Sequence, residues 1–214
     1  MKIFATLAVL AFATGAAQAA TYTLDFAGDI CGTGTGACAN GSAIAQGYGD
    51  VAGQLDVIYD GNAATGQQPL LHWGTGYETL GHVAYATASD TPFAIVFQAA
   101  SGFEVAVEGF DIAPYANRVR NSMVTVVAEG MASPLLETGL FEVSTDGVTH
   151  FPLGSVFASS VTLVLGPDAW DVGIGNIVYT LRETGGAAAI PLPATGVLLI
   201  GGLAALGARR RRTV

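Results

Sequence analysis

The central part of the chain, residues 20–183, alternates apolar and polar residues over many short runs that end at glycine-containing turns. Alternation at every second position puts the apolar side chains on one face of a β-strand, whereas an amphipathic helix needs a spacing near 3.6 residues. The run Val51–Tyr59 shows the pattern, with Leu55, Val57 and Tyr59 on one face. The alternation predicts an all-β fold, an antiparallel β-sandwich of the jelly-roll kind.

Several segments have the β-branched and aromatic content of strands and are separated by turn residues. The chain holds 29 glycines and only 12% charged residues, which suits short strands joined by glycine turns rather than long helices. The predicted strands are Thr21–Phe26, Val51–Tyr59, Phe93–Gln98, Phe103–Phe110, Ser122–Ala128, Leu140–Val143, Thr149–Leu153, Ser160–Leu165 and Gly173–Leu181.

The first residues have the pattern of a secretory signal peptide. Lys2 precedes an apolar run, Ile3–Ala13, and the small-x-small sequence Ala17–Ala19 follows. The apolar run is too short to span a bilayer. We therefore expect residues 1–19 to be a signal peptide cleaved after Ala19, so that residues 20–183 are exported.

The last residues have three consecutive parts. Residues 184–189 form a linker of mostly small residues, and residues 190–214 begin with a proline-containing motif and continue as an apolar run. From Ile190 the apolar stretch is 19 residues long, which predicts a transmembrane helix. A basic cluster at its end predicts a cytoplasmic C-terminus by the positive-inside rule. The cluster consists of Arg209, Arg210, Arg211 and Arg212.

This ending resembles the VPLPA-type C-terminal sorting signals, which are relatives of the PEP-CTERM signals handled by exosortases. The motif that carries the resemblance is Ile190, Pro191, Leu192, Pro193 and Ala194, with Ile where the family has Val. The resemblance implies transient anchoring in the inner membrane and cleavage by an exosortase-like enzyme. It further implies delivery to the cell surface or extracellular matrix of a Gram-negative bacterium that makes exopolysaccharide.

Two other interpretations of the same ending remain open. Leu192–Gly196 also satisfies the LPxTG pattern of sortase substrates, which are anchored to the cell wall. The apolar run is also compatible with an ordinary single-span anchor that is never cut. All three interpretations place the central part of the chain outside the membrane.

Parts of the central region have a second, looser resemblance. Gln46–Asp50, Leu71–Tyr77 and Phe103–Tyr115 look like a recurring body of PEP-CTERM proteins, and Leu163–Tyr179 resembles the final strands of galactose-binding-like jelly rolls. Those strands often finish with an Asp-Asn-Ile/Val element. Here Gly175–Val178 occupies that place without the aspartate, which argues against a cation site there.

Charge separates the ends of the chain from its centre. Five of the eight basic residues lie in the end segments, which leaves Arg118, Arg120 and Arg182 against all 17 acidic residues. Such an acidic body disfavours nucleic acid as a partner, because phosphate binding needs Lys and Arg. It is compatible with a divalent cation, with a neutral glycan such as exopolysaccharide, or with a purely solubilising role.

Two kinds of structural site are indicated by residue type. Cys31 and Cys38 are expected to form a disulfide after export, the alternative being free thiols. A calcium site would need several hard oxygen ligands, and Asp25 and Asp171 are the candidates if the first and last strands pair. Their neighbours Asp29 and Asp168 belong to the same hypothesis, and the alternative is exposed turn acids. No other cofactor is expected.

A glycan site needs an aromatic platform with polar groups beside it. The glycine-rich segment around residues 72–78 supplies His72, Trp73 and Tyr77, and the alternative is that Trp73 and Tyr77 merely cover the edge of the core. Further residues are candidates to converge on this segment, namely Tyr48, Asp50 and Tyr115.

Signals for catalysis are weak. Gly154–Val156 is not a G-x-S-x-G nucleophile elbow, and the three histidines do not have a zinc-ligand spacing. The sequence therefore favours a non-catalytic, exported module associated with glycan or matrix over an enzyme. The alternative from another class is a secreted carbohydrate-active enzyme.

Overall fold

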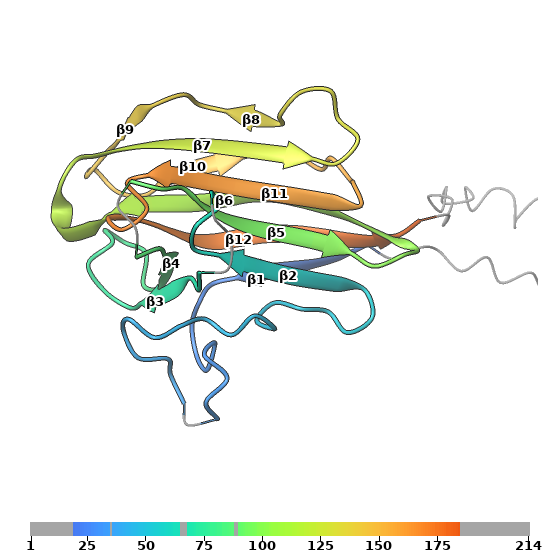
Figure 1. The fold of residues 1–214 in the computed structure, drawn as a ribbon, viewed down its shortest axis with the longest axis horizontal. Helices are drawn as coiled ribbons and strands as arrows, with labels where there is room; N and C mark the ends of the chain where they lie inside the picture. Colours follow the sequence, from blue (N-terminus) through green and yellow to red (C-terminus); the bar gives the residue numbers. More distant parts are fainter. Residues whose placement is uncertain (1–18, 35, 65–67, 88–89, 185–214) are drawn as a thin grey trace, which may run out of the picture. The chain divides into compact units, whose positions relative to one another are not determined.

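The alternating runs form strands of two antiparallel sheets in the computed structural model, which describes residues 19–34, 36–64, 68–87 and 90–184 (Figure 1). The elements within these residues are β1 (Ala20–Leu24), β2 (Leu55–Asp60), β3 (Leu71–Trp73), β4 (Val83–Tyr85), β5 (Phe93–Ala99), β6 (Phe103–Pro114), the 3-10 turn η1 (Tyr115–Asn117), β7 (Arg120–Ala128), β8 (Leu136–Glu137), β9 (Phe141–Val143), β10 (Thr149–Pro152), β11 (Ser160–Pro167) and β12 (Val172–Glu183).

The sheets confirm the predicted β-sandwich. One sheet has the order β10-β6-β12-β4-β3, with β1 also paired to β12. The other has the order β2-β5-β11-β7-β8, with β9 also paired to β7. The first and last strands pair, which is the condition that the calcium hypothesis set, with Ala20 opposite Leu181 and Leu24 opposite Ile177.

The core lies between the two sheets and follows the alternation read from the sequence. On β2 the predicted inward residues Leu55, Val57 and Tyr59 are buried, while the residues between them are exposed. Phe97 of β5 packs on Tyr179 of β12 across the sandwich, with ring centroids 5.1 Å apart. Full burial of a side chain of this size contributes about 1.5–3 kcal/mol, so the inter-sheet aromatics are a major part of the stability. Residues 19–184 form one compact unit around this core.

Several strands differ from the prediction in their presence or their length. The strands β3, β4 and β8 were not predicted, because runs of two or three residues are too short to show an alternation. Both β6 and β12 are longer than expected. A register shift between Gly175 and Val178 interrupts their pairing and hides the regular pattern in the sequence.

Cys31 and Cys38 form the predicted disulfide. The signal peptide, the linker, the motif Ile190–Ala194, the predicted transmembrane helix and the cluster Arg209–Arg212 lie outside the described residues. Among the residues that are described, no helix is long and apolar enough to span a bilayer.

The sandwich has two different ends. The start of β1 and the end of β12 lie together at one end, and η1 lies at the other, at the left of Figure 1. The first residue of β12, Val172, pairs with Pro114 directly before η1. The 12 residues of β12 therefore separate the two ends by about 40 Å, at about 3.3 Å per residue.

Candidate functional site: an aromatic pocket at the η1 end

Five aromatic side chains from separate segments surround a pocket of about 200 Å³ at the η1 end of the sandwich. Trp73 ends β3 and Tyr85 ends β4, while Tyr77 comes from the loop between these strands. Tyr115 begins η1, and Trp170 lies in the loop between β11 and β12. We call this set of five residues the aromatic pocket.

Backbone hydrogen bonds hold the contributing segments together. The N–H of Tyr115 donates to the carbonyl of Asp171 at 2.7 Å, which ties η1 to the loop that carries Trp170. The N–H of Ala116 donates to the carbonyl of Gly76 at 2.9 Å. Gly76 has φ of +82°, and a Cβ there would lie 3.0 Å from Cε2 of Tyr115. Glycine at this position therefore allows both the turn and the close approach of the Tyr115 ring.

The rings meet mostly at right angles. Trp73 is nearly perpendicular to Tyr85 and to Tyr115, at 85° and 82°, with centroids 6.1 and 5.8 Å apart. Tyr85 and Trp170 meet at 83° with centroids 5.9 Å apart. Tyr77 is buried beneath them, whereas Trp170 is 46% exposed. The pocket therefore has a fixed floor and one wall that reaches solvent.

Two polar groups of these aromatics differ in their partners. The hydroxyl of Tyr77 donates to the carbonyl of Trp170 at 3.2 Å, and burial raises the pKa of Tyr77 well above its usual value. The indole Nε1 of Trp73 is buried without a hydrogen-bond partner in the described part of the chain. A buried donor of this kind is costly when it is left unpaired.

The structure brings together three of the residues that the sequence pointed to, Trp73, Tyr77 and Tyr115. It adds Tyr85 and Trp170, which sequence reasoning missed. No local signal marks these two, because they join the others only through the pairing of β4 with β12 and through the loop before β12.

Tyr48 and Asp50 do not join the aromatic pocket. The Tyr48 hydroxyl accepts the N–H of Phe26 at 3.0 Å, and its ring packs on the core beside Phe26 and Tyr59. Burial, followed by a smaller contribution from the Asp25 carboxylate, raises the pKa of Tyr48 to about 12. Asp50 accepts the N–H of Val57 at 2.7 Å. Both residues stabilise the early part of the sandwich.

His72 also does not line the pocket. Successive strand residues face opposite sides, so His72 points away from the side that Trp73 occupies, and it is only 3% exposed. Its Nδ1 lies 3.4 Å from the carbonyl of Ala39, and its Nε2 lies 3.1 Å from Nδ1 of His82. Because a carbonyl only accepts, Nδ1 of His72 carries the proton and Nε2 accepts from His82. Burial is the main cause that lowers the pKa of His72.

The acidic residues considered for calcium have separate partners. Asp25 accepts hydrogen bonds from the Ala27 N–H and the Tyr48 hydroxyl, and Asp171 forms an ion pair with Arg120 at 2.9 Å. Asp29 accepts the Gly34 N–H at 2.6 Å. Among the described residues, no group of three or more His, Cys, Asp or Glu could hold a metal ion. The carboxylates proposed as calcium ligands therefore do not converge.

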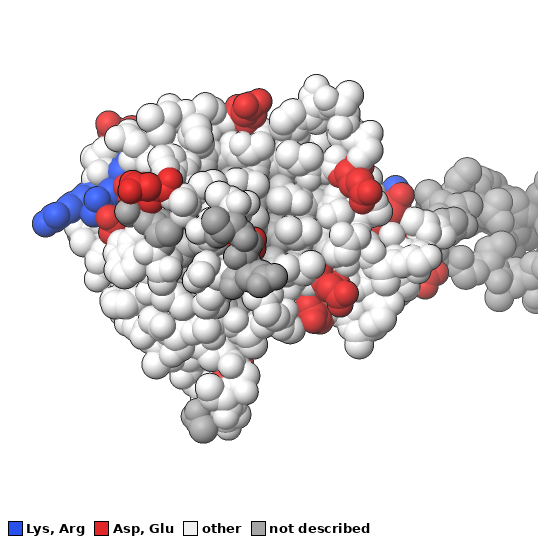
Figure 2. Space-filling view, in the orientation of Figure 1, with Lys and Arg blue, Asp and Glu red and all other residues white. Residues whose placement is uncertain are grey.

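Carboxylates gather beside Trp170. Burial raises the pKa of Asp168, and Asp171 raises it further, while Arg120 opposes this and Asp90 adds to it. Figure 2 shows acidic side chains spread over the visible face, with the largest basic group at the η1 end. Of the charged groups that act on Asp168, two are carboxylates, Asp171 and Asp90, and one is the guanidinium of Arg120.

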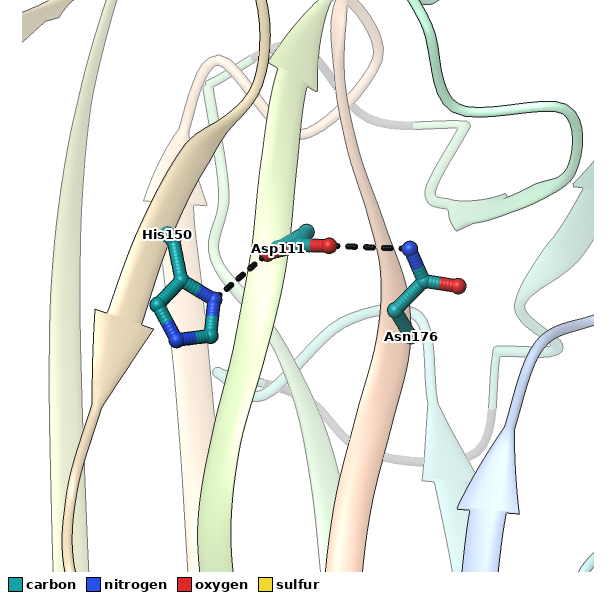
Figure 3. Close-up of polar contacts among 3 residues, drawn as sticks. All are labelled: Asp111, His150 and Asn176. Atoms are coloured by element: carbon teal, nitrogen blue, oxygen red, sulfur yellow. Dashed lines mark hydrogen bonds and ion pairs between the residues drawn. The ribbon is translucent and has the colours of Figure 1, made fainter.

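A second polar cluster crosses three strands away from the pocket. Asp111 of β6 accepts hydrogen bonds from His150 of β10 at 2.7 Å and from Asn176 of β12 at 2.8 Å (Figure 3). Asn176 has φ of +49° where the register shifts. The imidazole is oriented as in a catalytic dyad, but no Ser, Thr or Cys side chain in the described part of the chain is hydrogen-bonded to it. The cluster by itself therefore supplies no activated nucleophile.

No protein-family model and no curated protein matches the chain. Among solved structures, the C-terminal domain of a chitobiase from Bacteroides fragilis is 16% identical with a TM-score of 0.24. The match covers 44% of this chain and 64% of that domain. A second similar structure, GH31 CBM32-2 bound to GalNAc, is 12% identical with a TM-score of 0.30. That match covers 59% of this chain and 95% of the other. At these values neither similarity carries an argument about function.

Proposed function

We propose that the protein is exported, and that its β-sandwich binds a glycan of the cell surface or extracellular matrix through the aromatic pocket without catalysing a reaction. The aromatic pocket is the observation that carries this proposal. Sugar rings present C–H faces that pack on aromatic rings, and their hydroxyls pair with polar groups at the edge. The exposed ring of Trp170 offers such a face at the mouth of the pocket.

The size of the pocket limits what enters it. Pockets for drug-sized ligands measure about 300–1,000 Å³, and this one measures about 200 Å³. A single sugar residue or one substituent fits such a space better than a continuous chain. The proposed ligand therefore enters with one residue, and the rest of the polymer remains in solvent.

The C-terminal sequence supports a proposal about delivery. The motif Ile190–Ala194, the apolar run and the arginine cluster resemble a VPLPA-type sorting signal, so we expect an exosortase-like enzyme to cut the chain after anchoring in the inner membrane. The start of β1 and the end of β12 lie about 40 Å from the aromatic pocket. A C-terminal anchor beyond β12 is therefore compatible with a ligand bound at the η1 end.

Binding is tested with residues 19–184 on a glycan array, together with an assay for hydrolysis of the glycans that bind. We expect retention of a defined glycan class without turnover. Trp170→Ala should weaken that binding about tenfold, because it removes the exposed ring face. Ile58→Ala is the matched control, since Ile58 is similarly exposed, at 45%, but lies on β2. Turnover of a polysaccharide would show instead that the protein is an enzyme.

Sorting is tested by mass spectrometry of the protein recovered from the surface of the host. We expect the mature chain to have lost Arg209–Arg212. Replacing Pro191 and Pro193 by Ala should leave the protein uncut in the membrane, because the extended motif is lost. An intact C-terminus on the surface form of the natural protein would contradict the sorting proposal and favour a permanent anchor.

A further inference from the structure

The walls of the aromatic pocket are arranged as a box and not as a flat platform. Three pairs of rings meet at 82–85° with centroids 5.8–6.1 Å apart. All five residues around the space are Trp or Tyr. A neutral sugar needs one ring face and several hydrogen-bonding groups. A box of aromatic rings offers few such groups and therefore suits another class of ligand.

The face of an aromatic ring is negative, and it attracts a cation held within about 6 Å of its centre. Several such faces around one small space add their attraction, and indole is the strongest of the natural rings. Two of the five rings here are indoles, Trp73 and Trp170. The preferred guest of this box is therefore an organic cation, and the strongest binding is expected for an ammonium group.

The charges around the box favour the same guest. Asp171 directly follows Trp170 in sequence, and Asp168 precedes it by two residues. Arg120 pairs with Asp171. Asp90 also acts on Asp168, so the carboxylates of this loop outnumber the one guanidinium among them. A cation bound beside Trp170 would offset this excess of negative charge.

The charged groups nearest to the floor of the pocket are Asp171 and Arg120, which form an ion pair. Burial is the largest cause that raises the pKa of Tyr77, followed by Tyr85, and Asp171 raises it more than Arg120 lowers it. Arg118, which is exposed beyond η1, is not among the groups that shift the pKa of Tyr77 or of Asp168. Because Arg120 is paired with Asp171 at 2.9 Å, its charge beside the pocket is largely compensated.

We infer that the aromatic pocket recognises a protonated amine, and that the ligand is a glycan containing hexosamine residues with unacetylated nitrogen. The inference rests on the proposed glycan-binding function and adds the chemical class of the ligand. The ammonium group would lie among the ring faces, and the sugar ring would contact Trp170 at the exposed side. An acetylated nitrogen is neutral, so it would lose the cation–π attraction and the attraction of the carboxylates.

The inference is tested by calorimetry with residues 19–184 and four probes of known chemistry. These are a glucosamine tetramer, an N-acetylglucosamine tetramer, a neutral glucose tetramer, and tetramethylammonium. We expect the glucosamine tetramer to bind at least about tenfold more tightly than the acetylated one, and tetramethylammonium to compete with it. Binding should persist at physiological ionic strength, because contacts inside a pocket are screened less than surface attraction.

Two pairs of variants distinguish binding inside the aromatic pocket from nonspecific attraction of a cation to an acidic protein. Trp170→Phe keeps a ring face and should retain more affinity for the glucosamine tetramer than Trp170→Leu, which keeps only apolar area. Asp168→Asn should weaken binding several-fold, whereas Asp56→Asn removes one exposed carboxylate from β2 and should not. Equal losses for Leu and Phe, or for both aspartate variants, would overturn the inference.

The probes also distinguish the inference from the function on which it rests. If the acetylated or glucose tetramer binds as tightly as the glucosamine tetramer, glycan binding stands and the amine preference is wrong. If only tetramethylammonium binds, the pocket is an ammonium site and the glycan proposal is wrong. If none of the four binds and a glycan array is also blank, both are wrong.

Discussion

Adding one methyl group at Gly173 should loosen the floor of the aromatic pocket. Gly173 lies on β12, and a Cβ built there would be 2.7 Å from Cγ2 of Val83 and 2.9 Å from Cε1 of Tyr77. Real Cβ atoms essentially never approach so closely, and both neighbours are buried, at 0% and 2% exposure. Neither side chain can turn into solvent, so Gly173→Ala must displace Tyr77, Val83 or the strand.

The expected cost follows from these contacts. Overpacking a dense core costs about 1–3 kcal/mol, and two buried neighbours below 3 Å place Gly173→Ala at about 2–3 kcal/mol. Replacing Gly by Ala also reduces the entropy of the unfolded chain, which offsets about 0.5–1 kcal/mol. The net loss in the free energy of unfolding is about 1–2.5 kcal/mol, equivalent to a fall in Tm of about 2–10 °C for a domain of this size.

Thermal unfolding of residues 19–184 by circular dichroism measures the loss, and calorimetry with the glucosamine tetramer measures the effect on the pocket. Gly81→Ala is the matched control, because a Cβ at Gly81 has no atom within 4 Å and its φ is not left-handed. We expect the control to unfold at or slightly above the natural Tm with unchanged affinity. A Gly173→Ala protein that unfolds at the Tm of the control and binds as tightly would show that the added methyl group is accommodated without displacing Tyr77 or Val83.

Three further predictions concern other contacts. Burial lowers the pKa of His72 below the usual 6.5, so the folded chain binds fewer protons than the unfolded chain around this pH. The contribution of His72 to stability is therefore complete above about pH 6.5 and falls as the pH drops towards the lowered pKa. His72→Gln should flatten the resulting slope of Tm against pH. A double-mutant cycle with Asp111→Asn and His150→Gln, measured by urea unfolding at neutral pH, should give a coupling energy of about 0.5 kcal/mol, because the pair is half exposed. A coupling energy of zero would show that the contact is not maintained in solution. Replacing Cys31 and Cys38 by Ser should cost about 2 kcal/mol, measured by urea unfolding, because a short loop is closed, and an unchanged midpoint would contradict this.

The sandwich was predictable wherever a strand is long enough to show its alternation. The inward face of β2 follows directly from the spacing of Leu55, Val57 and Tyr59. The pairing of β1 with β12 was only a condition of the calcium hypothesis, and the structure shows that it occurs. The short strands β3 and β4 were not predictable, because their pairing is decided by contacts with β12 and with the segment around Ala43.

The pocket was predictable only in part, for a related reason. Trp73 and Tyr77 share one glycine-rich segment, so their proximity follows from sequence distance alone. Trp170 is nearly 100 residues away, and its approach depends on the hydrogen bond between the Ala86 N–H and the Ala169 carbonyl. Tyr48 was placed wrongly, because an amphipathic ring near a glycine suits the edge of a core as well as a binding site.

The position of β12 also determines how the domain would carry mechanical load. The strand begins beside Trp170 and ends at Glu183, and it is hydrogen-bonded to β6 on one side and to β4 and β1 on the other. With a ligand held at the η1 end and an anchor beyond Glu183, tension would run along the strand axis. The hydrogen bonds lie across that axis, so they would be loaded together in shear and not opened one after another. Under such a load the sandwich would be pulled in its most resistant direction.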